Sequence, residues 1–472
     1  MPSMLLVYPS SYNYPTAWDK VKIKSSQLLL ASYLAQFFPV EYADFEISIA
    51  RPASNVQTKR FERKVREYLA TRRFDILALS CWTSLSYKAT IAVARIAREL
   101  YPNCLMVVGG YHPSARPGDF FSKDRIIDYV IRGEGELALR DIAQSFPTAG
   151  RPVETKIVDS PTLYPEQFVG INWELSDPIV RDAFPDGVGD LAIYLSRGCP
   201  FSCSFCMESL KDHHWRPYSP AAAIEQIQLG AEHNRAYAIA IGDACFGVRP
   251  SWRKEFFRRL IDLKPSYWIT FETRPEYLDE EDIKLLSQLK VAIEIGLESC
   301  SPTMLRIMNK TRTPDKFLAS FRKMSRLLND YGIIHVANLI LNHPGETQQT
   351  LEESFGFVDE ESKINQSSLI WACHDYMHFP GSDIDWRQEF YEQEYGTVFL
   401  HPNWWHEDED ILGTSRNIYP SRDLTGERAR LWRQMYNERE RRLKDCLTDA
   451  AFKFGADSFF PRWRDDSRFG TL

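Results

Sequence analysis

Short apolar segments alternate with amphipathic helical segments along most of this chain, and this alternation most constrains how it can fold. Buried strands are expected as short apolar runs, whereas surface helices repeat apolar residues every three or four positions. Strands that alternate with helices predict parallel sheets, because each helix carries the chain back to begin the next parallel strand. The sequence therefore predicts an α/β protein.

The first series of such segments covers residues 1–150 and predicts a doubly wound sheet. The expected strands are Met4–Tyr8, Val40–Asp44 at an edge, Ile76–Ser80, Leu105–Val108 and Tyr129–Ile131. The expected helices are Gln27–Phe38, Thr58–Arg72, Lys88–Tyr101 and Glu136–Phe146. Ligands of such sheets bind outside the carboxyl ends of the strands, so the loops at those ends are candidate binding residues.

The second series covers residues 190–385, after an expected linker at residues 151–189. The expected strands are Leu191–Ser196, Ala236–Gly242, Trp268–Glu272, Val291–Gly296, Ile334–Leu341 and Ser368–Cys373. The expected helices are Ala221–His233, Trp252–Leu263, Glu280–Leu289, Asp315–Tyr331 and Thr347–Glu361. Six strand–helix units predict a partial (β/α)6 barrel, whose functional residues gather at the carboxyl ends of its strands.

Charge and composition restrict the partners of the chain. The net charge is −7 and there is no basic tract, which argues against a nucleic-acid partner. The amino terminus lacks the basic segment of a signal peptide, and no apolar stretch reaches eighteen residues. We therefore expect a cytoplasmic protein without a membrane span. The six scattered cysteines are expected to be reduced thiols, mostly buried: Cys81, Cys104, Cys245, Cys300, Cys373 and Cys446.

Three other cysteines form a C-x3-C-x2-C run at Cys199, Cys203 and Cys206. Three thiolates this close can hold three irons of a [4Fe–4S] cluster and leave the fourth iron open to an outside ligand. A closed zinc site that adds His213 or His214 is a second interpretation, although such sites usually pair their cysteines in two separate knuckles. A redox pair of Cys203 and Cys206 is a third, and it would require a thioredoxin-type context.

The cysteine run resembles the signature of the radical S-adenosylmethionine (SAM) superfamily, including the aromatic Phe205 before the last cysteine. The resemblance implies that the open iron is chelated by the amino and carboxylate groups of SAM. It also implies that one-electron reduction releases a 5′-deoxyadenosyl radical, with an external reductant of flavodoxin or ferredoxin type. The protein would then position the cofactors and exclude side reactions.

The carboxyl ends of the later strands extend this resemblance. In the family, Glu298 and Lys310 would meet the ribose hydroxyls and the carboxylate of SAM, and Glu272 would lie near its methionine moiety. Gly242 and Asp243 partly match an element that binds the SAM amino group. The turn from Leu341 to Thr347 resembles another family turn, with Asn342 and His343 in place of a small and an apolar residue. His343 would touch the adenine edge or the substrate side. The alternatives are barrel-mouth salt bridges for the charged residues and a surface turn for His343.

Three loops at the carboxyl ends of the first series are rich in glycine: residues 80–84, 109–113 and 132–136. Glycine pairs let the backbone approach a ligand closely, although ordinary βα turns are the alternative. No G-x-G-x-x-G follows the first strand, so a dinucleotide site is not supported. The loops resemble those of the Rossmann-like cobalamin-binding domain of one large radical SAM subfamily. This resemblance implies cobalamin contacts at Trp82, Thr83, Gly109, Gly110, Gly133 and Glu134.

The cobalt would lack one familiar ligand, because the sequence has no D-x-H-x-x-G element to supply a histidine. Trp82 or Thr83 could instead face the lower side of the corrin, and a core position is the alternative for Trp82. Residues 386–472 hold several tryptophans, an acidic run at 407–410 and an expected charged helix at Arg428–Leu447. This mainly helical region would either shape the substrate pocket or only cover the barrel.

These observations lead to one expected function and two alternatives. The subfamily resemblance implies a cobalamin-dependent radical SAM enzyme that methylates an unactivated carbon of a small molecule. Some members instead rearrange, contract or cyclise their substrates, with or without cobalamin. An iron–sulfur sensor or electron carrier would use the same cluster without turnover, but it would not need the set formed by Asp243, Glu272, Glu298 and Lys310.

Overall fold

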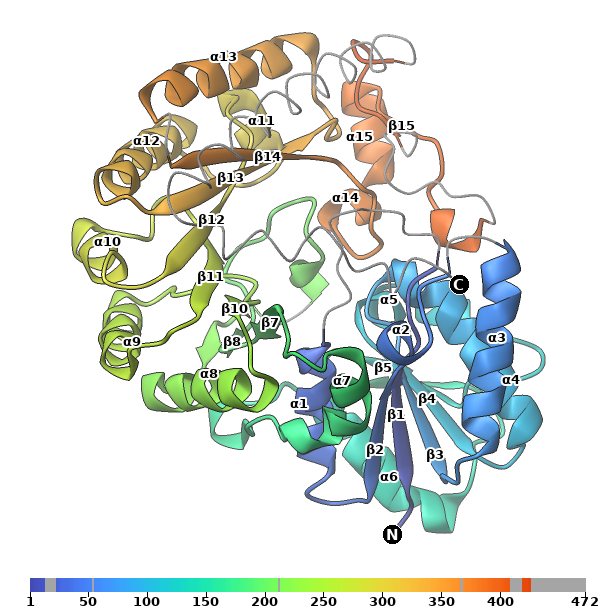
Figure 1. Cartoon of the computed structure of the whole chain (residues 1–472). Coiled ribbons are helices and arrows are strands. Elements are labelled where there is room, and N and C mark those ends of the chain that lie inside the picture. Colours follow the sequence, from blue (N-terminus) through green and yellow to red (C-terminus); the bar gives the residue numbers. More distant parts are fainter. Residues whose placement is uncertain (13–22, 53–54, 211–212, 366–367, 408–417, 426–472) are drawn as a thin grey trace.

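Two six-stranded parallel sheets lie side by side in the computed structural model of the protein, which describes residues 1–12, 23–52, 55–210, 213–365, 368–407 and 418–425 (Figure 1). The first sheet belongs to the amino-terminal part of the chain and the second to its centre. All pairings within both sheets are parallel, as the alternation of strands and helices predicted. The expected α/β fold class is therefore confirmed.

The first sheet has the strand order β2-β1-β3-β4-β5-β6. Because the order reverses between β1 and β3, the carboxyl ends of these strands form a topological switch point, the usual ligand site of such sheets. The last strand was not predicted: its short, mostly exposed segment falls within the expected linker. The strands are β1 (Met4–Tyr8), β2 (Val40–Asp44), β3 (Ile76–Ser80), β4 (Leu105–Gly109), β5 (Tyr129–Arg132) and β6 (Lys156–Asp159).

Helices cover both faces of this sheet. Along β1, Met4 and Leu6 point to the face covered by α1 (Ser25–Leu34) and α6 (Gly135–Ala149). Leu5 and Val7 point to the opposite face, where they pack with α3 (Asn55–Ala70) and α4 (Tyr87–Leu100). The side chains alternate because successive residues of a strand point to opposite faces. The sheet is thus doubly wound, as expected.

The second sheet has the order β14-β13-β12-β11-β10-β7 and curves into an open barrel. Among the described residues, β7 and β14 pair on one side only, so the barrel is partial. Its strands are β7 (Asp190–Ile193), β10 (Ala238–Ile241), β11 (Trp268–Thr273), β12 (Val291–Glu298), β13 (Ile334–Leu341) and β14 (Leu369–Asp375). The outer helices are α8 (Pro220–Asn234), α9 (Pro250–Leu263), α10 (Glu280–Leu286), α12 (Pro314–Asp330) and α13 (Gln348–Ile364).

Shorter elements join these two units. The first barrel strand ends earlier than expected, and the next residues form an antiparallel pair, β8 (Ser196–Arg197) with β9 (Arg216–Pro217). The remaining short helices are α2 (Phe45–Ser48), α5 (Tyr111–Ala115), α7 (Asp177–Ala183), α11 (Pro302–Ile307), α14 (Asp383–Trp386) and α15 (Gln388–Tyr395). Single 3-10 turns occur at Ser84–Ser86, Pro117–Phe120, Pro165–Gln167, Trp173–Ser176, Met207–Leu210 and Trp404–His406.

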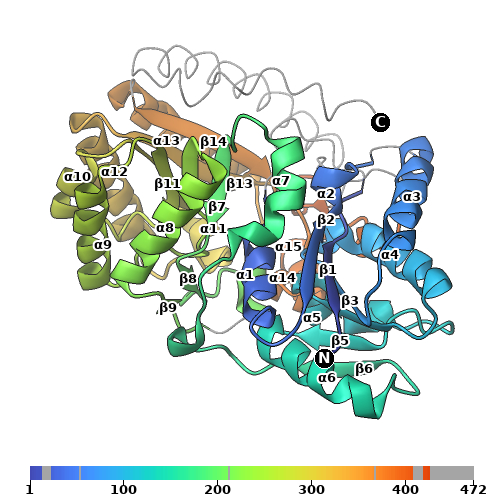
Figure 2. The same ribbon diagram turned by 60° about the horizontal axis from the view of Figure 1, so that its bottom comes forward.

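One continuous apolar core joins the two sheets. It runs from the α1 side of the first sheet through Leu28, Leu29 and Leu139 into the barrel residues Leu191 and Ile193. Figure 2 shows α1 between the two sheets. The carboxyl ends of the first sheet are therefore held in a fixed position against the mouth of the barrel.

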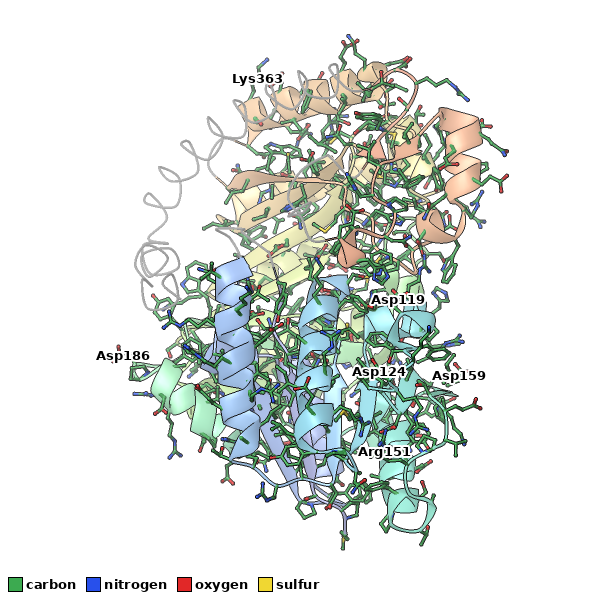
Figure 3. All side chains as sticks on the ribbon, turned by 90° about the vertical axis from the view of Figure 1, so that its right-hand side faces the viewer. Asp119, Asp124, Arg151, Asp159, Asp186 and Lys363 are labelled. Carbon is green, nitrogen blue, oxygen red and sulfur yellow. The ribbon has the colours of Figure 1, made fainter. Side chains whose placement is uncertain are left out.

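Two tryptophans that follow α15 join the barrel's later residues to the unit of the first sheet. The indole of Trp405 donates a 2.7 Å hydrogen bond to Asp119, and the indole of Trp404 donates one to the His378 carbonyl. Figure 3 shows Asp119 where the blue and orange parts of the chain meet. A two-stranded ribbon of β15 (Val398–Phe399) and β16 (Ile418–Tyr419) ends this region. The helix expected at 428–447 and most of the acidic run lie outside the described residues.

No helix among the described residues is long and apolar enough to cross a bilayer.

The shared core predicts that both sheets unfold together. Replacing Leu28, which is fully buried, with alanine should cost about 2–5 kcal/mol of unfolding free energy, because it leaves a cavity between the sheets. Calorimetry should show one transition that moves as a whole. Leu229→Ala on the exposed face of α8 is the matched control and should change little. Two separated transitions, of which only one responds to Leu28→Ala, would contradict a shared core.

Candidate functional site

The cysteine run lies on a loop that follows β8, beside the mouth of the barrel. The backbone N–H of Ser204 donates to the Met308 carbonyl at 2.9 Å, and the Asn309 side chain donates to the Ser202 carbonyl at 2.8 Å. From the other side, the N–H of Ile384 donates to the Ser204 carbonyl at 3.1 Å. The loop is thus fixed between the turn that follows α11 and the start of α14.

The three thiols lie in different environments. Cys203 is buried, whereas Cys199 and Cys206 are partly exposed. A hydrogen bond from the buried Cys245 thiol lowers the pKa of Cys199, which favours its thiolate form. Burial raises the pKa of Cys206. Sequence spacing gave no sign of Cys245, because it follows a different strand.

The geometry does not favour the zinc interpretation. Within the described ranges, no three His, Cys, Asp or Glu side chains converge closely enough to hold a single metal ion. The His213 ring contacts the carbonyl oxygen of Cys199 at 3.3 Å rather than a thiol.

Three charged side chains meet at Gly296 on β12. A Cβ atom there would lie 2.9 Å from Glu298 Oε1, 3.1 Å from Glu272 Oε1 and 3.1 Å from Lys310 Nζ. Glu298 and Lys310 form a buried ion pair of 2.9 Å. Glu298 has a φ of +68°, next to an irregularity in the pairing of β12 with β13, so its backbone is strained. The structure therefore brings together three of the residues that the resemblance assigned to SAM.

Glu272 faces the barrel lumen. Its side chain is open to the lumen, yet protein surrounds it closely enough that the resulting loss of solvation raises its pKa to about 7. The neighbouring carboxylates of Glu298 and Glu294 raise the pKa further, and Lys310 opposes them. A cationic group bound here would favour the ionised carboxylate.

Asp243 follows the second barrel strand, β10, as expected. Its Oδ1 accepts the N–H groups of Leu195 and Ser196 at 2.7 and 3.0 Å, and its Oδ2 accepts the Ser196 hydroxyl at 2.6 Å. It is 4% exposed, and burial raises its pKa to about 7. The carboxylate therefore fixes the residues that join β7 to β8, and the contact of Asp243 with the SAM amino group stays a prediction. A single Gly-Asp pair in the sequence could not distinguish these roles.

His343 is fully buried, so the alternative of a surface turn is wrong. Its Nδ1 donates to the Pro344 carbonyl at 2.8 Å, and its Nε2 accepts from the Ser204 hydroxyl at 3.3 Å. Burial lowers its pKa to about 4, which keeps the ring neutral. The ring also packs edge-on against Phe205. His343 therefore supports the cysteine loop through its contacts with Ser204 and Phe205. Leu341 is buried against Leu351 and Leu424.

A cavity of about 290 Å³ separates the switch point of the first sheet from the barrel mouth. Apolar residues of α1 and the sheet form its inner wall, including Leu6 and Leu29. Thr83 does not line it, because its hydroxyl caps the following 3-10 turn by accepting the Leu85 N–H at 3.3 Å. The other predicted cobalamin contacts all line the cavity, together with Gly242: Trp82, Gly109, Gly110, Gly133 and Glu134.

Two glycines of this cavity are required by the backbone. Gly110 has a φ of +123°, and a Cβ atom there would lie 2.3 Å from the Cys81 carbonyl oxygen. Gly133 has a φ of +88°. Residues that carry a side chain rarely adopt such φ values. Because glycine has no Cβ atom, a ligand can approach the backbone closely at both positions.

Polar residues link the cavity to the cysteine loop. The Tyr111 hydroxyl donates to Glu208, two residues after Cys206, and both line the cavity. Glu134 pairs with Arg216 at 2.6 Å and holds the β8–β9 ribbon against the first sheet. Tyr111 lies within the predicted loop 109–113, and Glu208 follows the cysteine run, but neither was predicted as a lining residue. Nothing in the sequence indicated that residues of α1 line the cavity.

No histidine lines this cavity. All ten histidines lie among the described residues, so this observation covers every histidine in the chain. His112 follows the glycine pair but turns away, with its Nδ1 2.7 Å from the Ser84 hydroxyl and its Nε2 3.2 Å from Asp119. Any metal held in the cavity would have no imidazole ligand from this chain.

Comparison with known families identifies both units. Residues 193–358 match the radical SAM superfamily, and residues 28–143 match the B12 binding domain. The chain is a radical SAM protein with a B12 binding domain. The cofactors expected from the sequence are those of these two domains: a [4Fe–4S] cluster, SAM and cobalamin.

Relatives of known name resemble both parts of this radical SAM protein. It is 26% identical over 354 residues to the anaerobic magnesium-protoporphyrin IX monomethyl ester cyclase of Rubrivivax gelatinosus, covering 68% of this chain and 60% of the relative. It is 25% identical over 318 residues to the cobalamin-dependent radical SAM methyltransferase TokK of Streptomyces tokunonensis, covering 61% of this chain and 45% of the relative. The chain thus spans only about half the length of these relatives.

The fold also has a close counterpart among solved structures. The radical SAM methyltransferase TsrM of Kitasatospora setae, with cobalamin and a [4Fe–4S] cluster bound, superimposes with a TM-score of 0.62 at 17% identity. The superposition covers 84% of this chain and 77% of TsrM. This likeness supports the shared arrangement of the two sheets.

The turn after β13 contains a buried carboxyl with a raised pKa. Glu346 is fully buried, its Oε2 accepts the Asn342 N–H, and its Oε1 has no hydrogen-bond partner among the described residues. Burial raises its pKa to about 8, above the usual 4.5 of a glutamate. The folded protein therefore keeps a proton here that the unfolded chain releases near pH 4.5.

This proton predicts a pH-dependent effect of Glu346→Gln. Between about pH 5 and 8 the native protein binds more protons than the unfolded chain at this site, so wild-type stability falls as pH rises. The variant lacks this loss, so its stability relative to wild type should increase over that window by at least about 1.4 kcal/mol. Denaturant unfolding at pH 5, 7 and 9 measures the difference. Glu352→Gln, on the exposed face of α13, should show no such trend.

Proposed function

We propose that this protein is a cobalamin-dependent radical SAM methyltransferase that methylates an unactivated carbon of a small molecule. The observation that carries the proposal is a cavity between the two sheets that loops of both units line. Loops of the B12 binding domain line one side, at Trp82 and Gly110. Glu208, next to the cysteine loop, lines the other. A methyl carrier and a radical source would then share one reaction space.

The barrel residues fit a cluster and SAM. Cys199, Cys203 and Cys206 would hold the cluster, because their thiols lie on one anchored loop. A cation and two carboxylates converge at Gly296, where a side chain would block them. Lys310 would bind the SAM carboxylate, and Glu298 would accept its ribose hydroxyls. Glu272 would face the amino group.

The cavity residues fit a corrin whose cobalt has no imidazole ligand. Gly110 and Gly133 would allow the backbone to lie against the ring. Trp82 follows β3 and lines the cavity. The ammonium nitrogen of Lys24 lies 5.6 Å from the centroid of its ring, and this cation–π contact holds the indole in place. Its face would cover one side of the corrin and keep water away from the metal. When bound, SAM and the cluster supply a radical that removes hydrogen from carbon, and cobalamin supplies a methyl group.

Cyclisation or rearrangement is the second candidate function. One observation favours it: the match to the magnesium-protoporphyrin cyclase covers more of this chain than the match to TokK. An electron carrier is a weaker candidate, because electron transfer alone would not require the charged cluster at Gly296. For either enzyme, an external flavodoxin or ferredoxin would supply the electron, and the substrate would be a small molecule.

Methyl transfer can be tested without knowing the substrate. The anaerobically reconstituted protein should bind about one cobalamin per chain, and it should move a deuterated methyl group from SAM to reduced cobalamin. The paramagnetic cob(II)alamin state should show no splitting from a histidine nitrogen of the protein in its electron paramagnetic resonance spectrum, because no histidine lines the cavity. Gly110→Ala should lose the corrin, whereas Gly118→Ala, with no atoms within 4 Å of the added methyl, should keep it. Formation of 5′-deoxyadenosine without methylated cobalamin would favour cyclisation instead.

The SAM assignment predicts a loss of affinity in the double variant Glu298→Gln/Lys310→Met. Removing both charges avoids leaving one buried ion unpaired. SAM should bind about ten- to a hundredfold more weakly, because a charge-assisted contact contributes about 1.5–3 kcal/mol. Equilibrium dialysis measures this, and iron analysis should still find a full cluster. Arg253→Met/Asp282→Asn removes a comparably buried ion pair between α9 and α10 and serves as the control. Native SAM affinity in the first variant would show that Glu298 and Lys310 form only a structural salt bridge.

A further inference from the structure

A buried arginine that the sequence analysis did not single out lies against the cysteine loop. Arg274 directly follows β11 and is only 5% exposed. Its guanidinium carbon lies 3.8 Å from the ring centroid of Phe201, which stands between Cys199 and Cys203 in the loop. The guanidinium therefore contacts the part of the loop that connects two of the proposed cluster ligands.

Hydrogen bonds and a second ring fix the position of this guanidinium. Its Nη2 donates to the Lys310 carbonyl oxygen at 2.8 Å. Its Nε and Nη2 also donate to Glu276 Oε1, at 3.0 and 2.8 Å. The ring centroid of Phe317, on α12, lies 5.3 Å from the guanidinium carbon. Arg274 thus connects the cysteine loop to Lys310, the residue proposed to bind the SAM carboxylate.

Two buried cations lie near the cysteine loop, and their counter-ions differ in exposure. Lys310 pairs with Glu298, and the two side chains are 7% and 9% exposed, so one buried charge offsets the other. Glu276, the partner of Arg274, has a side chain that is 34% exposed. Water screens an exposed charge much more than a buried one. Arg274 therefore leaves a net positive field inside the protein.

This field extends to the cysteine loop. Phe201 is two residues from both Cys199 and Cys203, so its Cα atom lies within about 7 Å of theirs. Burial raises the pKa of the Cys203 thiol, and the charges of Lys310 and Arg274 oppose that rise. Charges interact more strongly in a protein interior than in water. Negative charge added to a cluster on this loop would therefore be stabilised by Arg274.

We propose that Arg274 is a positioning residue whose charge raises the reduction potential of the cluster held by Cys199, Cys203 and Cys206. The inference rests on the proposed function, in which these three thiols hold the cluster. The external reductant loses one electron and the cluster gains it, so the cluster becomes more negative by one charge. The buried guanidinium favours this more negative state. The cluster therefore accepts the electron more readily than it would beside a neutral side chain.

Redox titration of the whole chain, reconstituted anaerobically, tests the proposal. Dithionite is the reductant, and the midpoint potential is read from the paramagnetic signal of the reduced cluster. Arg274→Met should make the equilibrium constant for cluster reduction about tenfold smaller, which lowers the potential by about 59 mV for a one-electron couple. Arg274→Lys keeps a cation and should stay close to the native potential. Glu276→Gln removes the opposing carboxylate and should raise the potential.

Arg322→Met is the matched control. Arg322 lies on α12 and makes the same two kinds of contact, with its guanidinium carbon 4.3 Å from the Phe357 ring centroid and an ion pair of 2.8 Å to Glu361. Both partners belong to α13, so these contacts lie between two outer helices of the barrel (Figure 1). The control should keep the native potential. Iron analysis of every variant shows whether it holds a full cluster.

The outcomes separate the charge of Arg274 from its packing. A native potential in Arg274→Met with a full cluster would overturn the proposal. Equal shifts in Arg274→Met and Arg274→Lys would also overturn it, because they would show that stacking on Phe201 matters rather than charge. If Arg274→Met loses its cluster, Glu276→Gln decides, and a potential at or below the native value there would refute the proposal. A native protein that binds no cluster would instead count against the proposed function.

Discussion

The packing of α1 and α6 between the two sheets is the constraint on which the rest of the site depends. Leu28, Leu29 and Leu139 belong to one apolar core that reaches from the first sheet to Leu191 in the barrel. Burial of this core contributes stabilisation in proportion to its apolar area and holds the two carboxyl edges opposite each other. The cavity between the sheets exists because these two edges cannot move apart independently.

Polar contacts then orient what the apolar core brings together. Glu134 reaches from the first sheet to Arg216, and Tyr111 reaches to Glu208 beside the cysteine loop. Trp405, in the segment that follows α15, donates a hydrogen bond to Asp119. Each contact joins segments that are distant in the chain, so each reduces the freedom of one domain relative to the other. A reaction that needs two cofactors at a fixed distance from each other would benefit from this restraint.

Buried charges and a strained backbone occur together at the barrel mouth. Glu298 has a positive φ that places it in a buried ion pair with Lys310, while Glu272 carries a raised pKa beside them. Such arrangements cost stability and persist where the surrounding structure over-determines them. A ligand with a carboxylate, hydroxyls and an amino group would offset these opposing charges, and SAM, which we propose to bind here, carries all three groups. The fold places this charged cluster close to the cysteine loop, because Lys310 follows the turn that anchors it.

The sequence determined the sheet type, the positions of most strands along the chain and most of the loops that line the cavity. Strands β1, β2 and β3 have the predicted bounds, because short apolar runs between amphipathic helices have few other arrangements in water. The sequence also determined that no histidine follows a D-x-H-x-x-G pattern. It missed β6 and α7, which are short and carry little apolar periodicity.

Only the tertiary structure decided what each polar side chain does. Asp243 binds the residues that join β7 to β8, Thr83 caps a turn, and His343 is buried against the cysteine loop, although their sequence positions suggested ligand contacts. The contribution of α1 to the cavity and the contact of Cys245 with Cys199 also depend on the fold. Hydrogen-bond partners and burial are set by segments that lie far apart in the chain, whereas periodicity is a local property. The sequence therefore specified the framework, and long-range packing specified the chemistry of its polar groups.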